Sequence, residues 1–190
     1  MKSAINTHPA PLANVRGFTL IELIIVIVIL GILAVTAAPK FIDITKDAND
    51  GVTRAHMGSF KSAIGMMRTK YLINQTSSIV INGMTTAFNS GGWPVGDGSA
   101  SAACADLWNK SFAEAQTITQ ASDFNAVLPE GWYTFGFSNQ VCAYIKSAGS
   151  ESLADGVSPH FVYYMTDFPS QSFGGNTYQG TAGEIKLYNL

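Results

Sequence analysis

The feature that most constrains this chain is an apolar run over residues 18–38, in which Glu22 is the only charged residue. A run of about 21 residues is close to the roughly 20 that an α-helix needs to cross the hydrocarbon core of a membrane. The basic residues Lys2 and Arg16 precede the run, and no acidic residue lies beside them. Because basic flanks stay on the cytoplasmic side, the sequence predicts that residues 1–17 are cytoplasmic and that the rest of the chain is exported.

Three kinds of segment fit such a run. The first is a cleaved signal peptide, for which residues 35–38 supply the small side chains of a cleavage site. The second is a permanent membrane anchor, and the third is a segment that the membrane holds only until it packs against copies of itself. Glu22 favours the third, because a carboxylate at the centre of a membrane helix costs about 2.5 to 3.5 kcal/mol and usually has a functional partner.

The partner that the sequence offers to Glu22 is an amine that processing would create. No basic side chain lies within residues 18–38. Cleavage after Gly17 would leave the α-amino group of Phe18 close to Glu22 in sequence, and on a neighbouring copy shifted along its axis that amine could face the carboxylate. The alternative is that Glu22 reaches the membrane surface from near the end of the helix and has no specific partner.

The residues around this position resemble a known processing signature. Residues 16–23 (RGFTLIEL), followed by the uncharged run, resemble the prepilin signature of type IV pilins and their pseudopilin relatives. The resemblance implies that a membrane aspartyl prepilin peptidase cuts between Gly17 and Phe18 and that Phe18 is N-methylated. It also implies that Glu22 is the fifth residue of the mature chain. Residues 26–41 resemble pilins of the mannose-sensitive haemagglutinin (MSHA) type more closely than other branches.

This resemblance implies an α+β type IV pilin fold, in which the C-terminal half of a long bent N-terminal helix packs on an antiparallel β-sheet. It divides the chain into a cleaved leader (1–17), a hydrophobic helix half (18–39) and a globular head (40–190). The helix half is held in the membrane before assembly and in the filament core afterwards. Gly31 and Pro39 are the expected kink positions, because proline removes a backbone hydrogen bond and glycine weakens a helix.

The spacing of apolar residues predicts the remaining elements. Apolar residues three and four apart between Phe41 and Tyr71 predict that the helix continues, with one buried face, to about residue 74. Asn82 and Gly83 predict a tight turn in a hairpin over residues 77–86. A short helix is predicted over residues 103–116, and β-strands over residues 132–137, 140–145, 161–166 and 184–188.

The chain has two cysteines, Cys104 and Cys142, which lie far apart in sequence and have no paired histidine nearby. An even number of cysteines behind an export segment indicates one disulfide formed in an oxidising compartment. The alternative is two buried free thiols. The family also brackets a variable surface region with one disulfide.

Several function classes find no support in the sequence. Residues 71–190 carry an excess of acidic residues, which repels the phosphate backbone of nucleic acids, so no nucleic-acid partner is expected. The three histidines are spread along the chain, and no sequence motif of a hydrolase, metalloprotease, nucleotide-binding loop or calcium loop occurs. We therefore expect no enzyme activity, no metal site and no cofactor.

The resemblance to type IV pilins implies a structural subunit of a type IV pilus, processed and polymerised into a surface filament for adhesion and biofilm formation. The expected partners are copies of the chain itself, the prepilin peptidase and methyltransferase, the inner-membrane assembly machinery, the membrane before assembly and, as a candidate receptor, a surface glycan. The expected location is the inner membrane and then the extracellular pilus. The alternatives are a minor pilin that initiates or caps the fibre, a type II secretion pseudopilin and, from another class, a membrane-anchored periplasmic enzyme.

Overall fold

The computed structural model describes residues 17–81, 83–149, 151–156 and 158–189, with the side chains of residues 38–43 and 45 left out. Apart from Gly17, the predicted leader therefore lies outside the described residues. The chain divides into two compact units, Met1–Ile44 and Thr45–Leu190.

After three non-helical residues, one helix, α1 (Leu20–Asn74), continues from the first unit into the second. The helix predicted for residues 18–74 is confirmed to within two residues. The backbone stays helical at both Gly31 and Pro39. The kink at these two positions stays a prediction.

The chain leaves α1 through a small antiparallel sheet with the strand order β1-β2-β3. Its strands are β1 (Ser78–Ile81), β2 (Met84–Phe88) and β3 (Pro94–Val95). The predicted hairpin is confirmed, since β1 pairs with β2 across Gly83, whose φ is +78°. A positive φ at this point suits glycine, which has no Cβ to clash with the backbone. Asn82, the other predicted turn residue, lies outside the described residues.

The main sheet has five strands in the order β10-β7-β6-β5-β4. They are β4 (Ile118–Gln120), β5 (Gly131–Phe137), β6 (Val141–Ser147), β7 (His160–Tyr164) and β10 (Ile185–Tyr188). The four predicted strands are confirmed with small shifts at their ends. All pairs are antiparallel except β4 with β5, which is parallel. Ser138 and Asn139, both with positive φ, form the tight turn between β5 and β6.

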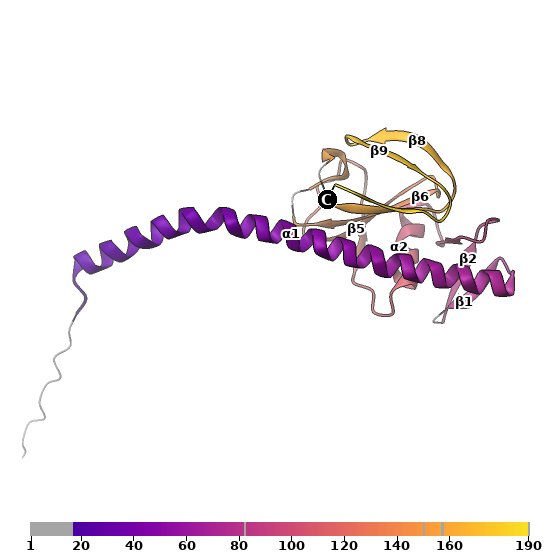
Figure 1. Cartoon of the computed structure of the whole chain (residues 1–190), viewed down its shortest axis with the longest axis horizontal. Helices are drawn as coiled ribbons and strands as arrows, with labels where there is room; N and C mark the ends of the chain where they lie inside the picture. Colours follow the sequence, from indigo (N-terminus) through magenta and orange to yellow (C-terminus); the bar gives the residue numbers. More distant parts are fainter. Residues whose placement is uncertain (1–16, 82, 150, 157, 190) are drawn as a thin grey trace, which may run out of the picture. The chain divides into compact units, whose positions relative to one another are not determined.

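Two core clusters cover the two faces of this sheet. The inner cluster packs α1 and α2 (Ala100–Ser111) against the sheet and includes Phe60, Ile64, Met67, Leu107, Trp108, Tyr144, Phe161 and Tyr163. The outer cluster packs β8 (Phe168–Phe173) and β9 (Asn176–Gly180) against the opposite face and includes Val141, Ala143, Ile145, Val162, Tyr164, Phe168 and Tyr178. Figure 1 shows the β8–β9 hairpin on one side of β5 and β6 and the part of α1 that lies within Thr45–Leu190 on the other side.

Successive residues of β6 and β7 alternate between these clusters, as the two-residue period of a strand requires. Tyr144 and Phe161 point to the inner cluster, and their ring centroids lie 5.0 Å apart. Ala143 and Val162 point to the outer cluster. Both faces of the sheet are therefore buried, and the predicted α+β fold, with the second half of the helix packed on the sheet, is confirmed.

Some elements differ from the predicted ones. The helix α2 begins and ends earlier than the predicted residues 103–116. Phe112 is already extended, and the indole Nε1 of Trp108 donates a hydrogen bond to the Gln116 carbonyl at 2.8 Å, so the chain folds back beside the helix. The strand β4, the β8–β9 hairpin and the 3₁₀ helix η1 (Leu153–Asp155) were not predicted.

Candidate assembly site on the N-terminal helix

The first turn of α1 is capped by its own side chains. The Thr19 amide and the Thr19 hydroxyl both donate hydrogen bonds to Oε2 of Glu22, each at 2.8 Å. In return the Glu22 amide donates to Oγ1 of Thr19 at 3.3 Å. This reciprocal capping box satisfies backbone donors that the start of a helix otherwise leaves unpaired. The position of Glu22 is therefore fixed by local chemistry as well as by any partner.

The second carboxylate oxygen of Glu22 remains open in the part of the chain that the structure describes. Oε2 accepts both of the hydrogen bonds from Thr19, whereas Oε1 accepts none. Both residues are exposed, and the neighbouring Phe18 side chain is 91% exposed. The end of the helix thus presents one free carboxylate oxygen and one free aromatic ring to whatever surrounds it.

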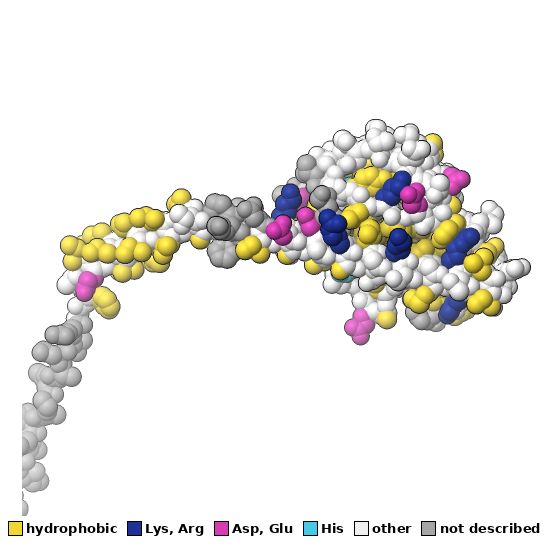
Figure 2. All heavy atoms as spheres, viewed as in Figure 1, with side chains coloured by type: hydrophobic (Ala, Val, Ile, Leu, Met, Phe, Trp, Pro, Cys, Tyr) yellow, Lys and Arg dark blue, Asp and Glu magenta, His cyan; other side chains and the backbone are white. Residues whose placement is uncertain are grey.

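Beyond this cap, the first half of α1 carries an unburied apolar surface. Thirteen large apolar side chains are between 45% and 76% exposed, namely Leu20, Ile21, Leu23, Ile24, Ile25, Val26, Ile27, Val28, Ile29, Leu30, Ile32, Leu33 and Val35. Figure 2 shows this apolar surface (yellow) along the first part of the helix. The segment Leu20–Ala37 is long and apolar enough to cross a membrane, with a mean hydropathy of 3.0 and none of its residues buried.

Apart from Oε1 of Glu22, the side-chain polar groups of this segment are paired within the helix itself. The Thr36 hydroxyl donates to the carbonyl oxygens of Ile32 at 3.3 Å and Leu33 at 3.0 Å. Beyond the first turn, the backbone groups are paired along the helix, so this part of the segment can leave water without exposing unpaired backbone donors or acceptors. Because an exposed apolar surface this long is rare in a water-soluble monomer, it requires a covering of lipid or of other apolar helices.

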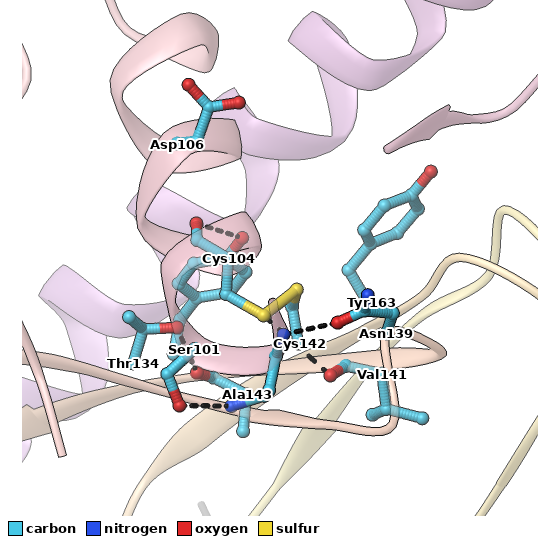
Figure 3. Close-up of a disulfide and its surroundings, with 12 residues drawn as sticks. Ser101, Cys104, Asp106, Thr134, Asn139, Val141, Cys142, Ala143 and Tyr163 are labelled. Carbon is cyan, nitrogen blue, oxygen red and sulfur yellow. Dashed lines mark hydrogen bonds between the residues drawn. A yellow bond between two sulfur atoms is a disulfide. The ribbon is translucent and has the colours of Figure 1, made fainter. Parts of the chain in front are cut away.

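The predicted disulfide is present in the head. Cys104, on α2, is joined to Cys142, on β6, with a Cα–Cα distance of 5.3 Å (Figure 3). Both residues are fully buried. The Tyr144 hydroxyl donates to the Cys104 carbonyl at 2.9 Å, and the Gly136 amide donates to Oγ of Ser101 at 3.0 Å, so hydrogen bonds on both sides hold α2 to the sheet.

The other predicted positions are less defined by contacts. A Cβ added at Gly31 would meet nothing within 4 Å, so no close packing requires a glycine there. Gly17 lies before the start of α1 and likewise has open space around it. Among the described residues, no group of three or more His, Cys, Asp or Glu side chains is arranged to hold a metal ion.

The hydrogen bonds between Thr19 and Glu22 were not predicted from the sequence. Thr19 and Glu22 have the three-residue spacing of a capping box, directly before an apolar run. That pattern could have identified the cap, and with it a partner for Glu22 inside the same chain. The geometry therefore gives Glu22 a local role in addition to the predicted role between subunits.

Comparison with known proteins assigns the N-terminal segment to a described motif. Residues 12–38 match the family model of the prokaryotic N-terminal methylation motif. The type IV narrow pilus major component PilA5 of Thermus thermophilus is 37% identical over 90 residues, which cover 47% of this chain and 78% of that protein. The type IV wide pilus major component PilA4 of the same organism is 37% identical over 79 residues, which cover 40% of this chain and 60% of that protein.

No solved structure matches the chain. Neither of the two relatives is described as a pilin of the MSHA type, so the closer resemblance to that branch stays a prediction.

Proposed function

Because this chain belongs to the type IV pilin family, and is therefore a structural subunit rather than an enzyme, we propose that it is the major subunit of a pilus used for adhesion and biofilm formation. The precursor is anchored in the membrane by its N-terminal helix, and the mature subunit is part of an extracellular pilus. The major role is proposed because both relatives are described as major components of their pili.

The observation that carries the proposal is the exposed apolar half of α1. Burial of each Leu, Ile or Val side chain of this segment contributes about 1.5 to 3 kcal/mol. Lipid provides that burial for residues 18–39 in the precursor, and the same residues of neighbouring subunits provide it in the filament core. Assembly therefore exchanges one apolar environment for another, so the helix can leave the membrane without entering water.

Processing of the precursor creates the amino group that pairs with Glu22 of another subunit during assembly. In the proposed sequence of events, a prepilin peptidase removes residues 1–17, and a methyltransferase modifies the new amino group of Phe18. That amine remains positively charged after a single methylation. Oε1 of Glu22, which Thr19 leaves open, then accepts a hydrogen bond from the Phe18 amine of a neighbouring subunit and sets the axial register of the filament.

The proposed pairing is tested by replacing Glu22 with alanine. The variant loses the carboxylate but keeps the cleavage site, so Phe18 still becomes the N-terminus while few or no pili form. The matched control is Glu114→Ala, which removes an exposed acidic side chain of the head and leaves assembly unchanged. The measurements are the N-terminal mass of the membrane-bound subunit and the amount of protein in sheared surface fibres. Abundant normal pili from Glu22→Ala would refute the pairing.

The same shearing experiment tests the proposed role. A major subunit is the bulk protein of the sheared fibres, whereas a minor pilin is present in trace amounts and its deletion lowers the number of fibres. A chain that stays with the cell envelope, while secretion of other proteins depends on it, would instead be a pseudopilin.

A further inference from the structure

The outer cluster does not fill the space between the main sheet and the β8–β9 hairpin. A cavity of about 120 Å³ lies there, within a single compact unit of the chain. Its buried floor consists of Val141 and Ala143 from β6 and Val162 from β7. Phe168 and Tyr178 line it from the hairpin. The floor belongs to the face of the sheet opposite α1, so this cavity is separate from the assembly site.

Leu153 of η1 and four phenylalanine rings complete the lining of the cavity. Phe124, Phe135, Phe137 and Phe173 all line it and are all partly exposed. The ring centroid of Phe124 lies 5.8 Å from those of Phe135 and Phe173. The Phe173 centroid lies 5.6 Å from that of Phe137. Since these rings reach solvent and the floor does not, they form the mouth of the cavity.

The surface that the lining presents to a ligand consists of carbon atoms, and no polar side chain in it is free to bind the ligand. Among the lining residues that the structure describes, Tyr178 alone carries a side-chain heteroatom. Its hydroxyl lies 3.0 Å from Nε2 of His160 and donates to it, because Nδ1 of that ring donates to the Ser158 carbonyl. A buried water requires two to four polar partners, and a sugar would leave its hydroxyls unpaired. The cavity therefore disfavours water and carbohydrate.

We propose that this cavity is a binding site for a small apolar molecule about the size of one aromatic ring. An apolar cavity of about 150 Å³ lined by aliphatic and aromatic side chains stays dry and binds benzene, so this one is of a suitable size for a single ring. The surrounding phenylalanines can meet a bound ring edge to face, the arrangement that aromatic pairs prefer.

The size of the cavity also argues against a protein partner. A specific protein interface buries about 1,000 Å² or more, whereas this cavity admits one ring-sized group. A ligand here contacts both the hairpin and the floor of the sheet. Binding therefore holds β8 and β9 against the sheet, and it does so whether or not the chain is assembled into a pilus.

The proposal is tested by titrating toluene into the full chain, held in detergent micelles and labelled with ¹³C at its methyl groups. We expect the NMR signals of Ala143, Val141 and Val162 to shift and to saturate as toluene is added. Ile64, a methyl-bearing residue of the inner cluster, should show no saturable shift. The methyl signals of the apolar half of α1 report the toluene that enters the micelle. Their shifts should keep increasing as toluene is added and should not saturate.

Three variants separate binding in the cavity from general partitioning. Ala143→Leu fills the floor and should weaken toluene binding about tenfold or more, because the added atoms occupy the volume of the ligand. Phe173→Leu removes one ring of the mouth at a partly exposed position and should weaken binding about threefold. Phe112→Leu, a partly buried ring packed against the inner cluster, is the matched control and should leave binding unchanged.

Two results would overturn the proposal. One is a shift of the Val162 signal that stays linear or is no larger than that of Ile64. The other is equal toluene affinity in Phe173→Leu and Phe112→Leu, a comparison that remains decisive if Ala143→Leu does not fold.

Discussion

At the scale of single residues, Glu22 and His160 show how the same problem, an ionisable group among apolar side chains, has two solutions. Glu22 is held by a local cap and keeps one oxygen free. His160 is 1% exposed and is held in one tautomer, with Nδ1 donating to the Ser158 carbonyl at 2.8 Å and Nε2 accepting from Tyr178. The capping box was readable in the sequence, whereas the burial of His160 depends on tertiary packing.

His160 makes the stability of the head depend on pH. Burial lowers the pKa of His160 below its usual value of 6.5, and the hydrogen bond to Ser158 and the charge of Asp155 oppose this only in part. Between the lowered pKa and 6.5 the unfolded chain binds more protons than the folded chain, so the folded state loses stability as the pH falls below about 6.5. Above that pH, the contribution of His160 is constant.

The measurement is the thermal unfolding midpoint of the full chain between pH 8 and pH 5, followed by near-ultraviolet circular dichroism. His160→Gln keeps an acceptor for the Tyr178 hydroxyl and has no proton to bind in this range. We expect its midpoint to fall less steeply than that of the unmodified chain. Parallel curves for the two proteins would show that His160 does not carry the pH dependence.

At the scale of elements, helices and strands were predicted correctly where the local pattern of apolar residues is sufficient to indicate them. The helix α1 was predicted closely because its apolar spacing persists over many turns, and β6 and β7 because their residues are apolar on both faces. The strand β4 has three residues and pairs in parallel with β5, which only the tertiary fold can specify. The strand β8 contains Pro169 and several polar residues, so its pattern does not indicate a strand.

The disulfide should contribute a large share of the stability of the head. Cys104 and Cys142 are 38 positions apart, and closing a loop of that length is worth about 4 kcal/mol in the chain-entropy account. The double variant Cys104→Ser/Cys142→Ser should unfold at a much lower guanidinium concentration than the unmodified chain. A reducing agent should lower the midpoint of the unmodified chain and leave that of the double variant unchanged. Equal midpoints under oxidising conditions would contradict this role.

Packing of α1 on the sheet depends on the inner cluster. Phe60 is fully buried, and its ring centroid lies 5.0 Å from that of Tyr144 and 5.6 Å from that of Phe161. We expect Phe60→Ala to lower the free energy of unfolding by about 3 to 5 kcal/mol, because it leaves a cavity between helix and sheet. Met66→Ala, on the same helix but 65% exposed, is the control and should change it by less than about 0.5 kcal/mol. Similar losses for both variants would contradict the assigned face.

At the scale of the whole molecule, one chain combines two units that bury their apolar side chains in different ways. Thr45–Leu190 buries two core clusters of its own and contains the disulfide. The apolar helix residues before it have no covering of their own and obtain one from lipid or from other subunits. The apolar run and the methylation motif are local features, so both could be recognised in the sequence without the fold. The predicted boundaries after residues 17 and 39 stay a prediction. The cavity beneath the β8–β9 hairpin was not predictable, since its lining residues are distant in sequence.

The most direct test of the account is mass spectrometry of the N-terminus of the mature protein, taken from sheared fibres and from membranes. We predict a chain that begins at Phe18 and carries one methyl group on its α-amino nitrogen. That result would establish the amine that Glu22 requires. A mature chain that begins near Ala38 would instead indicate an ordinary signal peptide and would remove the apolar helix from the filament, which contradicts the account.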